Sequence, residues 1–164
     1  MTTKADFTEE EWARLGRSPL VAGMAISLAD PGGPIETLRE SSAALQTVIE
    51  AAQSGSHGEF VQEVARDFAD KARHRQNPMA GFKPKGRDAG EEVLAELREV
   101  NRLLVEKVTP EEREQFREWL KTAAQRAATA AKEGGFLGFR AERVSENEQQ
   151  MLDKLGEVFG QPPT

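Results

Sequence analysis

The sequence predicts an all-α protein, a single-domain bundle of six or seven helices around a buried central hydrophobic helix at about residues 18–30. Between Leu20 and Ala29 the only polar side chain is that of Ser27. A helix that is apolar on every face is buried, either in a bundle or in a membrane, and a bilayer span requires roughly 20 apolar residues, about twice this run. Helix-capping patterns recur along the chain, and no strand-like alternation accompanies them.

A first short helix is expected over residues 8–15. Thr8 and Glu11 have the spacing of a capping box, in which each side chain bonds the backbone N–H of the other residue. Phe7 can pack on Trp12 as a hydrophobic staple across the start of this helix.

The central helix is expected to follow after a break at Gly16. Ser18 and Pro19 have the residue types of an N-cap and a first helical position. A turn at residues 30–33 should end the helix and make an antiparallel hairpin with the next one.

The remaining helices are predicted from a start signal followed by apolar residues at helical spacing. They are expected at about 34–53, 56–75, 88–108, 109–131 and 145–159. The capping pairs of the last four are Ser56 with Glu59, Asp88 with Glu91, Thr109 with Glu112, and Ser145 with Glu148. The stripe predicted to lie on the core in helix 34–53 consists of Ile35, Leu38, Leu45, Val48, Ile49 and Ala52. One domain should span residues 1–160, and residues 161–164 should form a disordered tail.

The composition excludes several kinds of site. The 164 residues contain no cysteine and no tyrosine, which excludes disulfides, thiolate metal sites, thiol nucleophiles and phenolic acids. The net charge of −6 disfavours general affinity for nucleic acids or anionic membranes. Acidic residues precede the apolar run where a signal peptide carries positive charge, and no membrane span is expected, so the predicted location is the cytoplasm. No cofactor is predicted.

The first candidate site is a basic segment over residues 71–87. It contains no acidic residue and six basic ones: Lys71, Arg73, Arg75, Lys83, Lys85 and Arg87. Such a segment could bind the phosphate groups of a nucleotide, a nucleic acid or a lipid surface. The alternative is that its charges are solvated and complement the dipole at the end of helix 56–75.

The second candidate is a metal site on helix 56–75. Four residues at steps of four, three and four share one helical face: Glu63, Asp67, Asp70 and His74. Carboxylates and an imidazole on one face are ligand types that divalent metals use. The alternative is a solvated face opposite the apolar one.

The third candidate is an interaction site at Phe136, Leu137 and Phe139, in a short apolar connection after Gly134-Gly135. Exposed apolar residues in a loop can dock another copy of the protein or a different partner. The alternative is that they close the end of the bundle.

Segments at both ends of the chain carry a resemblance. The segments are Phe7 to Trp12, Ala22 to Gly33, and Gly134 to Glu148. Together they resemble a family of small uncharacterised bacterial all-helical proteins. Residues from about Lys132 to Phe159 are also similar to the closing helices of tellurite-resistance TerB-like domains. The resemblance implies an all-α fold, a bacterial cytoplasmic setting and a role in stress response, and it assigns no metal ligand to this chain.

These patterns favour a non-catalytic helical protein that acts through protein–protein contacts, with an unknown partner or with itself. A nucleophile elbow, a phosphate-binding Gly-rich loop with lysine and a His-Glu-x-x-His motif are all missing from the sequence. The first alternative is an anion- or nucleic-acid-binding module that uses residues 71–87. The second is a metal-binding helical bundle.

Overall fold

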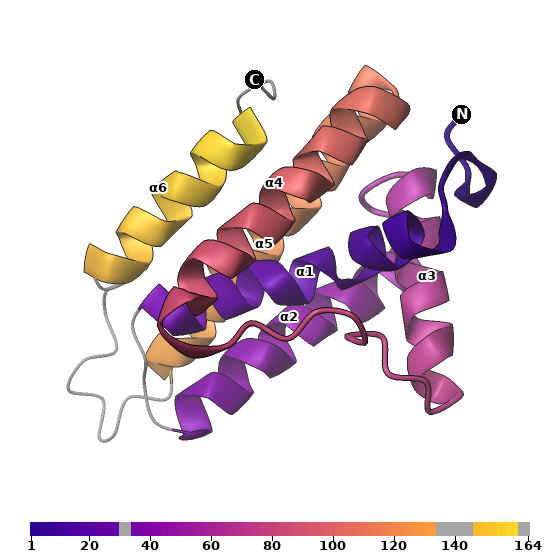
Figure 1. Cartoon of the computed structure of the whole chain (residues 1–164). Coiled ribbons are helices and arrows are strands. Elements are labelled where there is room, and N and C mark those ends of the chain that lie inside the picture. The colour runs from indigo at the N-terminus through magenta and orange to yellow at the C-terminus, as the bar shows by residue number, and fades with distance from the viewer. Residues whose placement is uncertain (30–33, 134–145, 161–164) are drawn as a thin grey trace.

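The apolar run of the chain lies in helix α1 (Glu9–Ala29), which contacts all five of the other α-helices described (Figure 1). The computed structural model describes residues 1–29, 34–133 and 146–160, with the side chains of 34–40, 86 and 131–133 left aside. The other helices are α2 (Pro34–Ser54), α3 (Glu59–Arg73), α4 (Ala89–Lys107), α5 (Pro110–Glu133) and α6 (Glu146–Gly160), with short 3-10 helices η1 (Lys4–Asp6) and η2 (Gly86–Asp88). Within these ranges there is no β-strand, so the all-α bundle around a central helix is confirmed.

The prediction of two separate helices within residues 8–30 was wrong. Helix α1 continues through Gly16, and Ser18 and Pro19 lie inside it rather than at its start. Proline has no N–H with which to bond the carbonyl four residues earlier. Here the Ser18 hydroxyl donates a hydrogen bond to that Leu15 carbonyl oxygen at 2.6 Å, in a site where both residues are fully buried. The helix can therefore continue past the proline, and the bundle has six α-helices in its described residues.

The predicted capping box and staple at the start of α1 are confirmed. The Thr8 N–H donates to the Glu11 carboxylate at 2.9 Å, and the Glu11 N–H donates to the Thr8 hydroxyl at 3.1 Å. The rings of Phe7 and Trp12 pack with centroids 5.6 Å apart. These contacts hold the N-terminal residues against the first turn of α1.

The predicted Ser56–Glu59 capping box was wrong. Helix α3 begins at Glu59, and Gly58 precedes it with a φ of 90°, a conformation that side chains other than glycine rarely adopt. A Cβ at Gly58 would also collide with the side chain of Gln115 on α5. A glycine turn packed against α5 thus sets the start of α3.

The other three predicted caps have different outcomes. Helix α4 begins just after Asp88, but the Asp88 side chain makes no capping hydrogen bond. The Glu112 N–H donates to the Thr109 hydroxyl at 3.4 Å, and the Glu112 carboxylate accepts hydrogen bonds from Thr2. Ser145 and the predicted tail 161–164 lie outside the described residues.

Helix α2 presents its apolar residues on two faces, whereas the sequence analysis assigned them to one. Val48 is fully buried as predicted, together with neighbours on the same side: Ala44, Thr47 and Ala51. Leu45 and Ile49 are 39% and 41% exposed, so their predicted burial was wrong. Ile35 and Leu38 have no described side chains. The part of α2 that faces α1 and α5 is made of smaller residues than expected, which leaves two large ones on the surface.

We expect Ser18→Ala to destabilise the fold by about 1–3 kcal/mol, because the buried Leu15 carbonyl, which Pro19 cannot reach with an N–H, would lose the hydroxyl that donates to it. Urea unfolding followed by circular dichroism measures this loss. Thr129→Ala is the matched control, since its exposed hydroxyl bonds a carbonyl inside an uninterrupted helix. In a Pro19→Ala background, which restores the N–H, Ser18→Ala should cost much less. An equal cost in both backgrounds would contradict this explanation.

Candidate functional site

Asp67 on α3 joins three elements through its carboxylate. Oδ1 accepts from Lys4 Nζ at 2.9 Å, and Oδ2 accepts from Trp12 Nε1 at 3.1 Å and lies 3.2 Å from Lys71 Nζ. Partial burial raises the pKa of Asp67, but the hydrogen bonds and positive charges of Lys4 and Lys71 outweigh it and hold this pKa below its ordinary value. The carboxylate is fully engaged in holding the N-terminal segment and α1 on α3.

The other members of the predicted metal set lie apart from this carboxylate. Asp70 is exposed and lies 3.7 Å from Arg73, while the His74 ring contacts the Asp70 backbone oxygen at 2.8 Å. Glu63 is half-buried. In the described part of the chain, no three His, Asp or Glu side chains form a group that could hold a metal ion. Two of the four predicted residues, Asp67 and Asp70, are instead engaged in ion pairs with basic side chains.

The basic segment is partly neutralised. Lys71 and Arg73 pair with Asp67 and Asp70, as above. The other four basic side chains are exposed and make no ion pair with any described residue: Arg75, Lys83, Lys85 and Arg87. Figure 1 shows the backbone of the connection from α3 to α4, in which these residues lie, stretched along the molecule.

Arg75 terminates α3 in a left-handed conformation, with a φ of 57°. The N–H groups of Arg75 and Gln76 donate to the carbonyls of Ala72 and Lys71, the hydrogen-bond pattern of a Schellman motif. Glycine is the usual residue at this position because it adopts a positive φ without steric cost. Here an arginine takes it, which places a charged side chain at the helix end.

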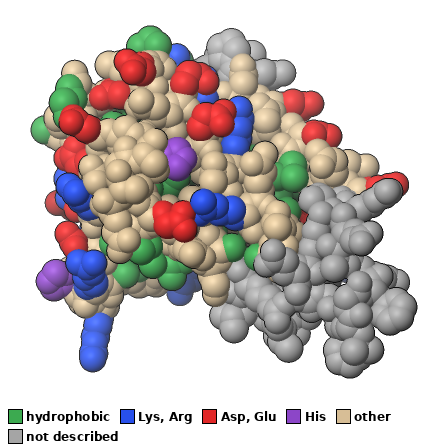
Figure 2. All heavy atoms as spheres, turned by 180° about the vertical axis from the view of Figure 1, so that it is seen from behind, with side chains coloured by type: hydrophobic (Ala, Val, Ile, Leu, Met, Phe, Trp, Pro, Cys, Tyr) green, Lys and Arg blue, Asp and Glu red, His purple; other side chains and the backbone are tan. Residues whose placement is uncertain are grey.

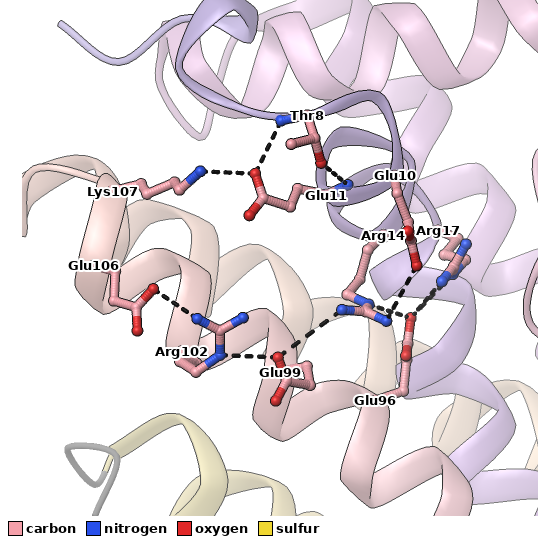
Figure 3. A network of polar contacts seen from close by, with 10 residues as sticks. All are labelled: Thr8, Glu10, Glu11, Arg14, Arg17, Glu96, Glu99, Arg102, Glu106 and Lys107. Carbon is pink, nitrogen blue, oxygen red and sulfur yellow. Dashed lines mark hydrogen bonds and ion pairs between the residues drawn. The ribbon is translucent and has the colours of Figure 1, made fainter.

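The connection between α3 and α4 is held on α1 by Arg17. Figure 3 shows Arg14 and Arg17 of α1 meeting Glu96 of α4, and the shortest contact joins Arg17 Nη2 to Glu96 Oε1 at 2.7 Å. Arg17 and Glu96 are both buried. The same guanidinium donates to the Ala80 carbonyl at 3.2 Å and lies over the Phe82 ring. One buried ion pair therefore fixes the path of the basic segment.

An anion site at the start of α4 is disfavoured by the chain's own carboxylates. Glu91 and Glu92 lie in the first turn of α4, where a helix attracts negative charge. The Glu92 carboxylate accepts a hydrogen bond from the Lys85 N–H at 3.2 Å. An external anion would have to compete with these side chains.

An apolar groove of about 350 Å³ lies between α2 and α3. Its floor contains the buried residues Val48 and Phe68, and its walls carry the exposed Leu45 and Ile49. The remaining lining residues are Ala52, Gln53, Ala69, Ala72 and Arg73. Figure 2, seen from behind, shows apolar side chains gathered low on this face beside basic ones. This groove has an apolar lining, an open mouth and a charged edge, as sites that bind amphipathic helices do.

His57 lies in the turn before α3, half-buried, with Nδ1 3.2 Å from the Ser56 hydroxyl. Burial and the positive charge of Arg126 lower its pKa, against smaller opposing effects of Glu118 and Glu50. The ring is therefore neutral at pH 7. Glu50 pairs with Arg126 and Glu118 with Lys121, so among the described residues no carboxylate is hydrogen-bonded to this imidazole.

Sequence reasoning missed the groove and the anchoring role of Arg17. The signal for the groove was present, because the apolar residues of α2 are too many for one helical face. The role of Arg17 depends on Glu96, which is 79 residues away along the chain. The predicted interaction residues Phe136, Leu137 and Phe139 lie outside the described residues.

No helix in the described ranges is long and apolar enough to cross a membrane. Comparison of the chain with family models, with curated proteins and with solved structures gave no match.

We expect Asp67→Asn to destabilise the protein by about 1 kcal/mol at pH 7, because both lysine ion pairs are lost. The pKa of Asp67 is lowered by folding, so its stabilising effect is present above the unfolded-state pKa of about 4 and disappears as the pH falls through the lower folded-state value. Urea unfolding at pH 7 and pH 3 should show the difference between wild type and variant shrinking in acid. Asp70→Asn, at an exposed ion pair, should change stability little at either pH.

Proposed function

We propose that this protein is a non-catalytic helical module that binds a protein partner in the groove between α2 and α3. The observation that carries the proposal is the exposure of Leu45 and Ile49 beside an apolar cavity whose floor reaches Phe68. The described residues contain four large hydrophobic side chains that are exposed, and two of them are these groove residues. A concentration of apolar surface at one place supports a role in binding.

The size of the groove supports a weak and reversible interaction. The α2 wall runs from Leu45 to Gln53, which at 1.5 Å per residue is about 12 Å, or about two turns of a bound helix. Completing the burial of each exposed aliphatic side chain contributes about 1 kcal/mol. A surface of this extent lies at the small end of protein interfaces, where complexes are weak and transient.

The cellular location and the biological role are proposed only from the resemblance to TerB-like domains. The similarity to TerB-like domains supports a bacterial cytoplasmic protein with a role in stress response. Phe136, Leu137 and Phe139 are a second proposed contact for a partner or for another copy of the chain. The metal-binding alternative has the least support, because Asp67 is already held by two lysines and a tryptophan.

To test the groove, a synthetic helical peptide with a leucine stripe and an uncharged polar face is titrated into ¹⁵N-labelled protein. We expect chemical-shift changes confined to residues 45–53 and 68–73. Leu45→Ser with Ile49→Ser should weaken binding at least tenfold, because the α2 wall loses both of its exposed aliphatic side chains, while the circular dichroism spectrum stays unchanged.

Leu28→Ser is the matched control for this titration, since Leu28 is 39% exposed, as Leu45 is, and does not line the groove. It should leave peptide binding unchanged. Equal loss of binding in the control and in the groove variant, or shifts spread over the whole protein, would contradict the proposed site.

A second candidate function is binding of a polyanion along residues 71–87. It is favoured by the four exposed cations that make no ion pair with described residues. Their extended arrangement suits a chain of phosphates better than a single phosphate group.

For this second function, affinity for a single-stranded oligonucleotide should fall steeply with salt and disappear in Lys83→Glu, Lys85→Glu and Arg87→Glu combined. Arg75→Gly should reduce the salt slope by about one. It should also stabilise the fold by about 0.5–1 kcal/mol, since glycine suits the positive φ. Binding that does not respond to salt would exclude this function.

A further inference from the structure

We infer that the partner helix carries acidic side chains along one flank of its apolar stripe, facing α3. This inference depends on the proposed function, because it names the chemistry of the partner that occupies the α2–α3 groove. It is carried by the unequal charges of the two groove edges.

Two arginines lie on the α3 side of the groove, Arg73 among its lining residues and Arg66 bonded to the lining residue Ala52. Arg73 lines the groove and its side chain is 76% exposed. Arg66 lies seven residues earlier, which is about two helical turns and places the two side chains on nearly the same side of α3, about 10 Å apart. Two cations at this spacing match two acidic residues on one side of a docked helix.

Arg66 is fixed in place by a groove residue. Its Nε donates to the Ala52 carbonyl at 3.1 Å. Ala52 lies in the last turn of α2, where carbonyl oxygens have no helical N–H partner, so a side-chain donor stabilises the helix end. This bond uses Nε and holds the exposed guanidinium beside the groove, where its terminal nitrogens can meet a carboxylate.

The α2 edge is uncharged. Gln53 lines the groove. Gln46, seven residues earlier on nearly the same side of α2, lies outside the groove lining, between α2 and α5. Glu50 is directed toward α5, where it pairs with Arg126. A bound helix would therefore meet positive charge on one side and a neutral amide on the other.

Asp70 is the acidic residue that pairs with Arg73, and this exposed pair leaves the charge of Arg66 unopposed. Like Arg66 it is absent from the groove lining, but at 100° per residue it lies farther round α3 from the groove than Arg66 or Arg73. Its distance of 3.7 Å from Arg73, with both side chains mostly exposed, describes a weak pair. An acidic partner can replace this pair without leaving a buried charge.

The inference is tested with three synthetic helices that share one leucine stripe and differ in one flank, which is glutamate, glutamine or lysine. Fluorescence anisotropy at low salt should give about tenfold tighter binding for the glutamate peptide than for the glutamine peptide, and weaker binding for the lysine peptide. Added salt should remove most of this difference, because the charges lie at an exposed rim.

Arg66→Glu with Arg73→Glu should reverse the order of the glutamate and lysine peptides. Arg73→Glu alone, which keeps the bond from Arg66 to Ala52, should at least reduce the preference for glutamate if the double variant fails to fold. The matched control is Arg98→Glu with Lys154→Glu, two exposed cations outside the groove that make no ion pair with described residues. This control should keep the wild-type order.

The outcomes separate the inference from the proposed function. Equal binding of all three peptides would overturn the acidic-flank inference and leave the groove standing. Absence of binding by every peptide would overturn the groove itself. Tight binding of a glutamate peptide whose leucines are replaced by serine would show attraction to a basic surface without the groove, which also overturns the inference. If the protein self-associates and Leu45→Ser with Ile49→Ser abolishes this, the occupant of the groove is a second copy of the chain. This result would also overturn the inference of an acidic partner helix.

Discussion

The fold depends on passing a helix through the middle of the bundle without leaving any of its backbone polar groups unsatisfied. An unpaired carbonyl in such a place costs as much as several ordinary contacts contribute. Pro19 would create one at Leu15, and the Ser18 hydroxyl removes it. Because α1 stays helical past Pro19, it is long enough to contact every other α-helix described, and these helices pack against it.

Buried charged groups, like buried backbone polar groups, also have to be paired. Arg17 is almost fully buried, and Glu96 on α4 accepts two hydrogen bonds from its guanidinium. Leaving one of these charges without the other would be costly, so the pair holds α1 and α4 in a fixed relation. The donors that remain on Arg17 attach the α3–α4 connection to the same point. A single buried cation thereby organises both the core and the most basic part of the surface.

The groove exists because the buried face of α2 carries small side chains. Ala44 and Ala51 allow α2 to approach α1 and α5 closely, as small residues do in helix packing. With that face turned inward, Leu45 and Ile49 come to the surface beside the small side chains of Ala69 and Ala72 on α3. Small residues on α3 leave room that larger ones would fill. The open space is therefore bounded by apolar atoms and, at the α3 edge, by arginines.

Local pattern alone determined the helical class and most helix boundaries, because cap chemistry and apolar spacing act within a few residues of the chain. The Thr8–Glu11 box and the Phe7–Trp12 contact are of this kind. Local pattern did not show that Leu28, in the run predicted to be buried, is 39% exposed. Tertiary structure decided which of two apolar faces of α2 is buried, which carboxylate pairs with Arg17, and whether the α3 acids gather or separate. Each of these outcomes depends on residues distant in sequence, and the competition between them is resolved only when the helices pack together.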